Sequence, residues 1–357
     1  MPTLDLTSSS IDITRALCDI ESVSGNERQI ADAVEAAVAG CAHLEVIRDQ
    51  DAVVARTHLG RDRRVVIAGH LDTVPVHNNF PSRFDGAELV GRGTVDMKAG
   101  VAVQLKLAAE LSEPLLDVTW IWYDHEEVAS ELNGLGRLAR TRPELLQGDF
   151  AILGEPTNAV VEGGCNGTLR IEVTSHGVRA HSARAWVGRN AIHAASPILE
   201  RLAAYEPRDV EVEGLVYRES LNAVGISGGV ASNVIPDECT VTINYRFAPN
   251  RTGEEAAAHV RELFADLDEL TFEVTDLAEG ARPGLDAPLA QDFLKAVGGQ
   301  AQPKYGWTDV ARFSALGIPA VNYGPGDALR AHADDERVDT AHITQCEQGL
   351  RAWLTGA

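Results

Sequence analysis

Five residues of metal-ligand type are spread along the chain, and most of them follow or flank an apolar, strand-like run. They are His70, Asp96, Glu127, Glu155 and His332, with Glu126 directly before Glu127. Imidazole and carboxylate groups are the ligands by which proteins bind zinc, and paired metal ions catalyse hydrolysis in several enzyme classes. In an open α/β sheet, ligands bind beyond the carboxyl ends of the strands, so residues distant in sequence can meet there. The pattern predicts a two-metal hydrolase.

Taken one at a time, these residues also have ordinary structural explanations. Asp96 could cap a helix, and Glu126–Glu127 could be a solvated acidic turn. Glu155 and His332 could be polar loop residues on the surface. Chance does not readily place five such residues in comparable local contexts, so a metal site is the better interpretation.

The elements that must position these residues alternate between strand and helix. Strands are predicted at 44–48, 52–57, 64–69, 117–123 and 149–153. Ser24–Glu27 has capping-box spacing and predicts a helix through Val38, a second helix begins at Asp96, and others cover 134–140 and the segment from about 340. This order predicts a mixed or largely parallel sheet with helices on both faces, which is an α/β fold.

The pattern changes at about residue 168. Strands near 168–173, 221–227, 239–247 and 270–275 alternate with helices near 190–204 and 253–266. That βαββαβ order predicts a ferredoxin-like α+β unit, with 280–288 as the return linker. Because His332 lies beyond this unit, we expect a discontinuous catalytic domain, 1–167 and 281–357, with an inserted domain at 168–280.

Composition limits the partners. A net charge of −22 argues against nucleic acid and anionic membranes, and a site for an anionic substrate must supply its own positive charge. Five cysteines without CxxC spacing indicate reduced thiols. The stretch Met1–Leu6 lacks the basic start of a signal peptide, and no run approaches the roughly 18 to 20 apolar residues of a membrane span. We therefore expect a cytoplasmic protein.

Four stretches together resemble the M20 family of co-catalytic zinc amidohydrolases, which includes desuccinylases, deacetylases and carboxypeptidases. They are Gly69–Pro75, Gly91–Lys98, His125–Glu127 and Gly154–Thr157. The resemblance runs over nearly the whole chain and implies a zinc-exopeptidase-like catalytic domain with an inserted lid and dimerisation domain.

The resemblance also implies a role for each residue of the site. His70 and Glu155 would bind one Zn²⁺, Glu127 and His332 would bind the other, and Asp96 would bridge the two. Asp72 would orient His70, since a metal-bound imidazole needs an acceptor for its second ring nitrogen. Glu126 would be the general base for a metal-bridged hydroxide. Co²⁺ or Mn²⁺ could replace zinc at such ligands. One departure is His125, where many relatives have an acidic residue.

Further matches lie in the inserted domain and near the end of the chain. Gly177–Arg184 resembles the family's lid motif, whose histidine, here His181, stabilises an oxyanion in the partner subunit, so a homodimer is implied. A surface histidine in a hairpin is the alternative. Substrate-binding residues are predicted at Asn233, Arg246, Arg184, Thr308 and Gly324. Arg246 could clamp a substrate carboxylate or form a surface ion pair.

The substrate class follows from finer resemblance. Glutamate at position 155 accompanies deacylases and carboxypeptidases in this family. The stretches Tyr123–Val128, Asn133–Gly136 and Ala180–Trp186 most resemble the branch of bacterial desuccinylases that hydrolyse N-succinyl-LL-2,6-diaminopimelate to succinate and LL-2,6-diaminopimelate, in lysine and cell-wall biosynthesis. The alternatives are an acetylornithine deacetylase or another N-acyl-amino-acid deacylase of the family. A non-catalytic binding module would not need Glu126 beside a full ligand set.

Overall fold

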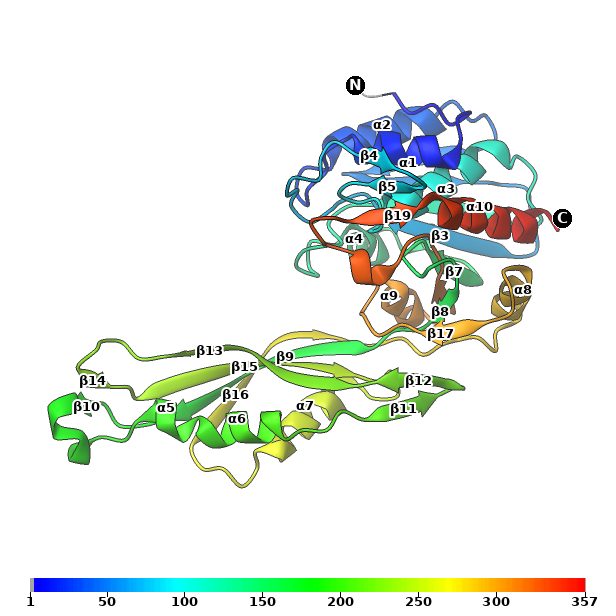
Figure 1. The fold of residues 1–357 in the computed structure, drawn as a ribbon. Coiled ribbons are helices and arrows are strands. Elements are labelled where there is room, and N and C mark those ends of the chain that lie inside the picture. The colour runs from blue at the N-terminus through cyan, green and yellow to red at the C-terminus, as the bar shows by residue number, and fades with distance from the viewer. Residues whose placement is uncertain (1–2, 357) are drawn as a thin grey trace. The chain divides into compact units, whose positions relative to one another are not determined.

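The chain divides into two compact units. A computed structural model describes residues 3–356 (Figure 1). Met1, Pro2 and Ala357 lie outside the described residues. The predicted Met1–Leu6 stretch and the two outer ends of the predicted catalytic domain are therefore described only in part. The first unit comprises Met1–Gly164, Pro283–Gln302 and Thr308–Ala357, and the second comprises Cys165–Arg282 and Pro303–Trp307. No helix within residues 3–356 is both long and apolar enough to cross a membrane.

An eight-stranded mixed sheet forms the centre of the first unit. In spatial order its strands are β1 (Glu45–Asp49), β2 (Ala52–Arg56), β6 (Asp117–Tyr123), β3 (Arg64–His70), β7 (Phe150–Leu153), β18 (Ala320–Asn322), β8 (Val161–Gly163) and β17 (Ala301–Pro303). The four neighbours β6, β3, β7 and β18 are parallel, whereas β1, β2 and β8 pair antiparallel. The predicted mixed sheet is confirmed, and its parallel part brings four strand ends to one edge.

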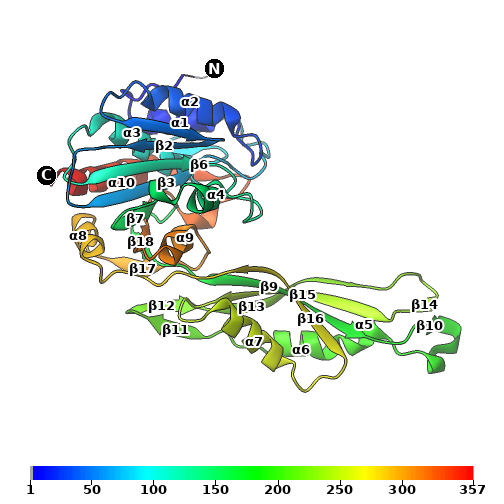
Figure 2. The ribbon, with the colours of Figure 1, turned by 180° about the vertical axis from the view of Figure 1, so that it is seen from behind.

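Helices cover both faces of this sheet. One face carries α1 (Ser10–Cys18), α2 (Arg28–Val38), α3 (Lys98–Glu110), α8 (Pro288–Ala296) and α10 (Thr340–Thr355). The other carries α4 (Gly134–Thr141) and α9 (Val310–Ala315) (Figure 2). Short additions to this unit are η1 (Pro143–Leu145), η3 (Ala328–Arg330) and a small sheet of β19 (Arg337–Asp339), β5 (Glu88–Val90) and β4 (Arg83–Asp85).

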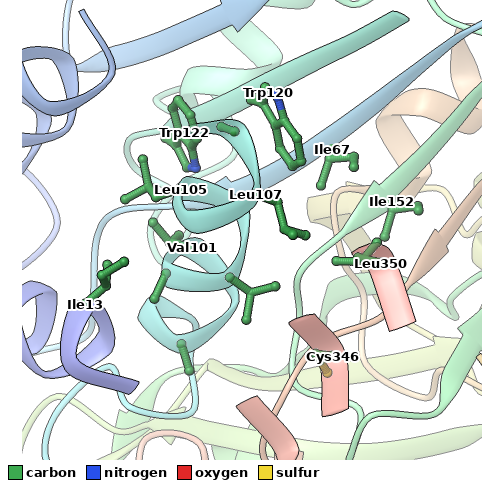
Figure 3. Packing of buried hydrophobic residues seen from close by; sticks show 14 of the residues in the cluster. Ile13, Ile67, Val101, Leu105, Leu107, Trp120, Trp122, Ile152, Cys346 and Leu350 are labelled. Atoms are coloured by element: carbon green, nitrogen blue, oxygen red, sulfur yellow. The ribbon is translucent and has the colours of Figure 1, made fainter. Parts of the chain in front are cut away.

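The core of the first unit is packed around α3. Alternate residues of a strand share a face, so Trp120 and Trp122 of β6 both lie on the side of the sheet that packs against this helix (Figure 3). Helix α3 is apolar on nearly all sides, and its residues from Lys98 to Ala108 are buried. A helix with that composition is stable only inside a core. The loop that carries Asp96 therefore leads directly into a helix that is packed inside the core.

The second unit is the predicted ferredoxin-like fold. Its antiparallel sheet has the order β13 (Ser220–Gly228), β15 (Glu238–Phe247), β9 (Gly167–His176) and β16 (Leu270–Ala278). Three helices contribute to its core, α5 (Ala191–Ala194), α6 (Ser196–Ala203) and α7 (Gly253–Leu263). The helix predicted over 190–204 is split, because Pro197 stands in the first turn of α6. Two small antiparallel pairs extend the unit: β10 (Ala180–His181) with β14 (Val234–Ile235), and β11 (Asp209–Val212) with β12 (Leu215–Arg218), while η2 covers Ser182–Val187.

The predicted capping box at Ser24–Glu27 is wrong. Helix α2 begins at Arg28, and its N-cap residue Glu27 makes no side-chain cap hydrogen bond. Instead, the Ser24 hydroxyl donates to Asp72 Oδ2 at 2.7 Å. Glu27 Oε1 accepts the Gly25 N–H at 2.9 Å and the His125 N–H at 3.2 Å. The two side chains that a capping box needs are thus bonded to distant segments, Ser24 to Asp72 and Glu27 to His125.

Candidate metal centre

The predicted ligands lie at the carboxyl ends of three adjacent parallel strands. His70 is the last residue of β3, Glu126 and Glu127 follow β6, and Glu155 follows β7. Strand β3 pairs with both β6 and β7, so these strand ends are neighbours. Asp96 reaches the same place from the loop before α3, where it is hydrogen-bonded to His70. The sheet topology thus assembles residues that are far apart in sequence.

Asp96 lies between the two histidines. His70 Nε2 is 3.1 Å from Asp96 Oδ1, and His332 Nε2 is 3.4 Å from Asp96 Oδ2. His332 Nε2 also lies 3.0 Å from Glu127 Oε1. Among the described residues, His70, Asp96 and Glu127 form a group whose ligand atoms lie within 4.8 Å of one another. One carboxylate that faces an imidazole on each side has the arrangement of a bridging ligand, so this donor set fits a pair of divalent cations.

The charges of this cluster are strongly coupled. Hydrogen bonds to Asp96 and Glu127 raise the pKa of His332 to about 10. Burial alone would lower the pKa of His70, but hydrogen bonds to Asp72 and Asp96 outweigh it, and the net pKa is well above the usual range. Burial alone would raise the pKa of Asp96, but hydrogen bonds to the two histidines outweigh it, and the net pKa lies below the usual value. Carboxylates and imidazoles therefore stabilise each other's charged forms here.

Asp72 connects His70 to the glutamate pair. The Asp72 side chain is fully buried, and its two oxygens accept the backbone N–H groups of Glu126 and Glu127, each at 3.0 Å. His70 Nδ1 lies 3.0 Å from the Asp72 carbonyl oxygen and 3.5 Å from Asp72 Oδ1. Burial raises the pKa of Asp72, but hydrogen bonding to His70 and to backbone groups brings it to about 2. The carboxylate stays ionised and fixes the imidazole against the turn after β6.

The surroundings of Glu126 raise the pKa of its carboxyl group. Burial raises its pKa well above the usual value, and the negative charges of Glu155 and Asp309 add to this, while His70 opposes it. A carboxylate with a raised pKa is better matched to accept and return a proton near neutral pH. Glu155 is itself buried, with 5% of its surface exposed.

The sequence predicts Asp309, together with Thr308, to line the substrate cleft, but it does not predict the contacts that Asp309 makes at this edge. Asp309 is fully buried and accepts hydrogen bonds from Tyr123 Oη at 2.7 Å and Asn133 Nδ2 at 3.0 Å, and it also pairs with Arg312. It ties α9 to the end of β6. The available signal was a charged residue directly after the predicted substrate residue Thr308.

His125 contacts two carboxylates beside the ligand group. Its Nδ1 lies 2.8 Å from Asp124 Oδ2 and 3.4 Å from Glu27 Oε1, and its φ is 58°. Asp124 is in turn bound by Arg137 Nη2 at 2.8 Å. His125 therefore contacts Glu27 and Asp124, and Asp124 joins it to Arg137.

Thr308 and Gly324 have packing contacts in the first unit. Thr308 is buried, and its hydroxyl donates to Asn322 Oδ1 at 2.9 Å. A Cβ on Gly324 would lie 2.2 Å from the Gly154 carbonyl oxygen, so only glycine fits against the loop that carries Glu155. A substrate contact by either residue stays a prediction.

The predicted oxyanion residue His181 and the other predicted substrate residues lie in the second unit. His181 is exposed and its Nδ1 accepts the Ala183 N–H at 3.1 Å, while the Asn233 carbonyl accepts the Ser182 N–H at 2.9 Å. Arg184 is exposed in η2. Arg246 is half-buried and lines a cavity of about 380 Å³ whose other lining residues are Asn166, Pro207, Arg218, Glu219, Ser220 and Tyr305. Burial and the nearby Arg170 lower the pKa of Arg246. The roles predicted for these four residues stay predictions.

Known proteins resemble the chain over its whole length. Residues 66–355 match the model of peptidase family M20/M25/M40. A succinyl-diaminopimelate desuccinylase of Corynebacterium glutamicum is 48% identical over 362 residues, covering 99% of this chain and 98% of the relative. A Mycobacterium tuberculosis protein with a provisional assignment to the same enzyme is 54% identical over 354 residues, covering 99% and 100%.

Solved structures match the fold. An M20 metallo-carboxypeptidase of Sulfolobus solfataricus has a TM-score of 0.79 at 15% identity, covering 97% of this chain and 98% of that one. A dinuclear metal-binding peptidase of Bacillus subtilis from family M20 has a TM-score of 0.73 at 17% identity, covering 97% and 96%. At these identities the likeness establishes the architecture.

Proposed function

The chain belongs to peptidase family M20/M25/M40, whose members are metal-dependent hydrolases, and we propose that it hydrolyses N-succinyl-LL-2,6-diaminopimelate to succinate and LL-2,6-diaminopimelate. The observation that carries this proposal is the match to the Corynebacterium glutamicum desuccinylase, at 48% identity over 99% of the chain. The mutual contacts of His70, Asp96, Glu127 and His332 support the presence of a metal-binding hydrolytic centre.

We propose that the centre holds two Zn²⁺ ions. His70 and Glu155 are the proposed ligands of one ion, Glu127 and His332 of the other, and Asp96 of both. The support is chemical: an imidazole nitrogen and a carboxylate oxygen lie 3.0–3.4 Å apart in His70–Asp96, His332–Asp96 and His332–Glu127. When bound, such a pair of ions polarises the acyl oxygen and activates water. Co²⁺ and Mn²⁺ accept the same ligands.

Glu126 is the proposed general base. Its carboxylate takes a proton from the attacking water as the new C–O bond forms at the succinyl carbonyl carbon. It returns that proton to the nitrogen of diaminopimelate as the amide C–N bond breaks, so the products are succinate and a free amine. Asp72 keeps the backbone N–H of Glu126 in place during both transfers, through the bond of 3.0 Å.

The second unit is proposed to act as lid and dimerisation domain. His181 would stabilise the oxyanion in the partner subunit, and Arg246, Arg184 and Asn233 would bind substrate carboxylates. The exposure of His181 and Arg184 is compatible with such roles. Strand β13 lies at an edge of its sheet and leaves Val224 and Ile226 exposed by 59% and 55%, which supports pairing with a second copy. Thr308 and Gly324 would complete the substrate site.

A cytoplasmic location belongs to the same proposal. All five cysteines lie among the described residues, and all are free thiols. Four of them are buried, and none forms a disulfide. Free thiols of this kind are typical of a reducing compartment, where bacterial amino-acid biosynthesis takes place.

The test is hydrolysis of N-succinyl-LL-2,6-diaminopimelate against N-acetylornithine, by zinc-loaded and by chelated protein. The proposal expects preference for the succinyl substrate, loss of activity on chelation and recovery with Zn²⁺. Faster turnover of N-acetylornithine would instead identify a deacetylase of the same family.

A variant tests the base. Glu126→Gln is expected to lower kcat by about 10²- to 10⁴-fold because proton transfer is lost, while the number of bound ions stays unchanged. Glu131→Gln, at an exposed glutamate of the same loop, is the matched control. Normal turnover by Glu126→Gln would refute the assigned role.

A further inference from the structure

A buried carboxylate holds the backbone of the bridging residue. Glu336 is 1% exposed, and its Oε1 accepts the N–H groups of Val95 at 2.9 Å and of Asp96 at 3.2 Å. The Gly91 N–H donates to the Glu336 carbonyl oxygen at 3.0 Å. The segment Gly91–Asp96 is irregular, and while Arg92 and Thr94 donate to backbone carbonyl oxygens, the N–H groups of Val95 and Asp96 depend on this side chain. A charged acceptor makes stronger bonds than a neutral one.

Arg92 joins the same carboxylate to the backbone beside His332. Arg92 Nη1 lies 2.7 Å from Glu336 Oε2 and 3.4 Å from the carbonyl oxygen of Ala333, the residue after His332. Its Nε donates to the Pro75 carbonyl oxygen at 3.2 Å. The Arg92 side chain is 5% exposed, so these contacts are largely shielded from water. Arg92 and Glu336 together form a clamp between the segment that ends in Asp96 and the segment that begins with His332.

His332 needs such support because of its backbone. Its φ is 64°, in the left-handed region that residues other than glycine seldom adopt. A conformation of this kind persists only where surrounding contacts determine it. The Ala333 carbonyl receives the Glu336 N–H at 3.2 Å as well as the Arg92 side chain, so the clamp fixes the turn directly after His332.

We infer that Arg92 and Glu336 are positioning residues that align Asp96 with His332 and so set the affinity of the metal ion at Glu127 and His332. The inference rests on the proposed two-metal function, and it adds residues that touch neither metal nor substrate. Asp96 would serve both ions, but His332 serves one. Loosening the clamp therefore disturbs two ligands of that ion and a single ligand of the ion at His70 and Glu155.

The test is metal binding by metal-stripped full-length protein, measured by titration calorimetry with Zn²⁺ and by the absorption spectrum with Co²⁺. Glu336→Gln keeps the shape of the side chain, but its amide nitrogen cannot accept a hydrogen bond from Arg92. Residues that orient metal ligands typically change affinity by about 10- to 100-fold. We expect the ion at Glu127 and His332 to bind at least about tenfold more weakly and to show an altered Co²⁺ spectrum. The ion at His70 and Glu155 should change little. Arg92→Lys, which keeps the charge, should give the same pattern and decides the matter if Glu336→Gln does not fold.

Asp117→Asn is the matched control. Asp117 is also a buried carboxylate of the first unit, and it accepts the N–H groups of Leu59 at 2.8 Å and Arg61 at 3.0 Å and faces Arg64 at 3.8 Å. It stands at the amino end of β6, away from the ligand edge. We expect this control to bind both ions as the wild type does.

Two results overturn the inference: wild-type affinity for both ions in Glu336→Gln and Arg92→Lys, or an equal loss in Asp117→Asn. Because no substrate enters the titration, failure of the clamp is distinguishable from failure of the desuccinylase proposal. If the desuccinylase proposal fails, the wild-type protein binds two ions but does not cleave the succinyl substrate.

Discussion

A methyl group added at Gly100 tests how tightly the loop before Glu155 is held. A Cβ at this position would lie 2.2 Å from the Gly154 carbonyl oxygen and 3.0 Å from the Gly154 carbonyl carbon. Non-bonded heavy atoms normally keep about 3.5 Å apart, so a 2.2 Å contact requires a displacement of about 1 Å. The same carbonyl would also be 2.2 Å from a Cβ on Gly324, so two glycines enclose it. The backbone there has little room to move.

Two effects of Gly100→Ala oppose each other. Gly100 is in the first turn of α3, where alanine is favoured over glycine by about 1 kcal/mol. Forcing extra atoms into a packed core costs about 1–3 kcal/mol. Since the obstructing atoms are backbone and not a flexible side chain, we place the steric cost at the upper end. The expected net loss is then about 2 kcal/mol in the free energy of unfolding.

Urea unfolding of the metal-free protein, followed by tryptophan fluorescence, measures this difference. Trp120 and Trp122 lie in the core beside α3 and report on the first unit (Figure 3). Gly40→Ala is the control, because its Cβ would meet nothing closer than the Ala37 carbonyl oxygen at 3.8 Å. A Gly100→Ala protein as stable as the wild type, or more stable, would show that helix propensity wins and that the loop yields.

Two further substitutions test the supports of the site. Ser24→Ala removes the 2.7 Å bond to Asp72 Oδ2 and is expected to weaken Zn²⁺ binding about tenfold, because Asp72 orients His70; unchanged affinity by calorimetry would contradict this. Asp117→Asn tests the pH dependence of stability: burial raises the pKa of Asp117, but hydrogen bonds from Leu59 and Thr57 lower it below the usual value. A lowered folded-state pKa stabilises the protein above the unfolded-state value of about 3.9. The difference from wild type in urea unfolding should therefore be full at neutral pH and shrink as pH falls through the folded-state pKa, and a difference that persists at low pH would exclude this cause.

The architecture could be predicted because its signals are local. The sequences of β3, β6 and β7 are continuous apolar runs, which indicate strands covered on both faces. The alternating sequence of β9 in the second unit indicates a strand with one covered and one exposed face. The parallel order then required the carboxyl ends of the strands to meet at one edge. Helix α1 and strands β18 and β19 were not predicted, because they are short or lack a clear period.

The supporting contacts could not be predicted because they join distant segments. Ser24 reaches Asp72 across 48 residues, and Asp96 reaches Glu336 across 240. The capping-box error has the same origin: Ser24 and Glu27 match a local motif, but tertiary partners bind both side chains. A local pattern gives the side chain's capacity to bond and leaves its partner open.

Two groups of carboxylates near the site differ in what their oxygens face. Asp72, Glu336 and Glu27 accept backbone N–H groups of the turns that hold Glu126, Asp96 and His125. Those bonds fix the backbone of the turns.

Asp96 and Glu127 differ, because the partners of their oxygens are imidazole nitrogens of His70 and His332. An imidazole nitrogen is itself a metal ligand, so a cation between such a pair satisfies both groups at once. Residue type cannot separate the two groups, since both consist of Asp and Glu. The partners of the oxygens do separate them: Asp96 and Glu127 face imidazole nitrogens and suit metal binding, whereas Glu336 and Asp72 accept backbone N–H groups and suit positioning.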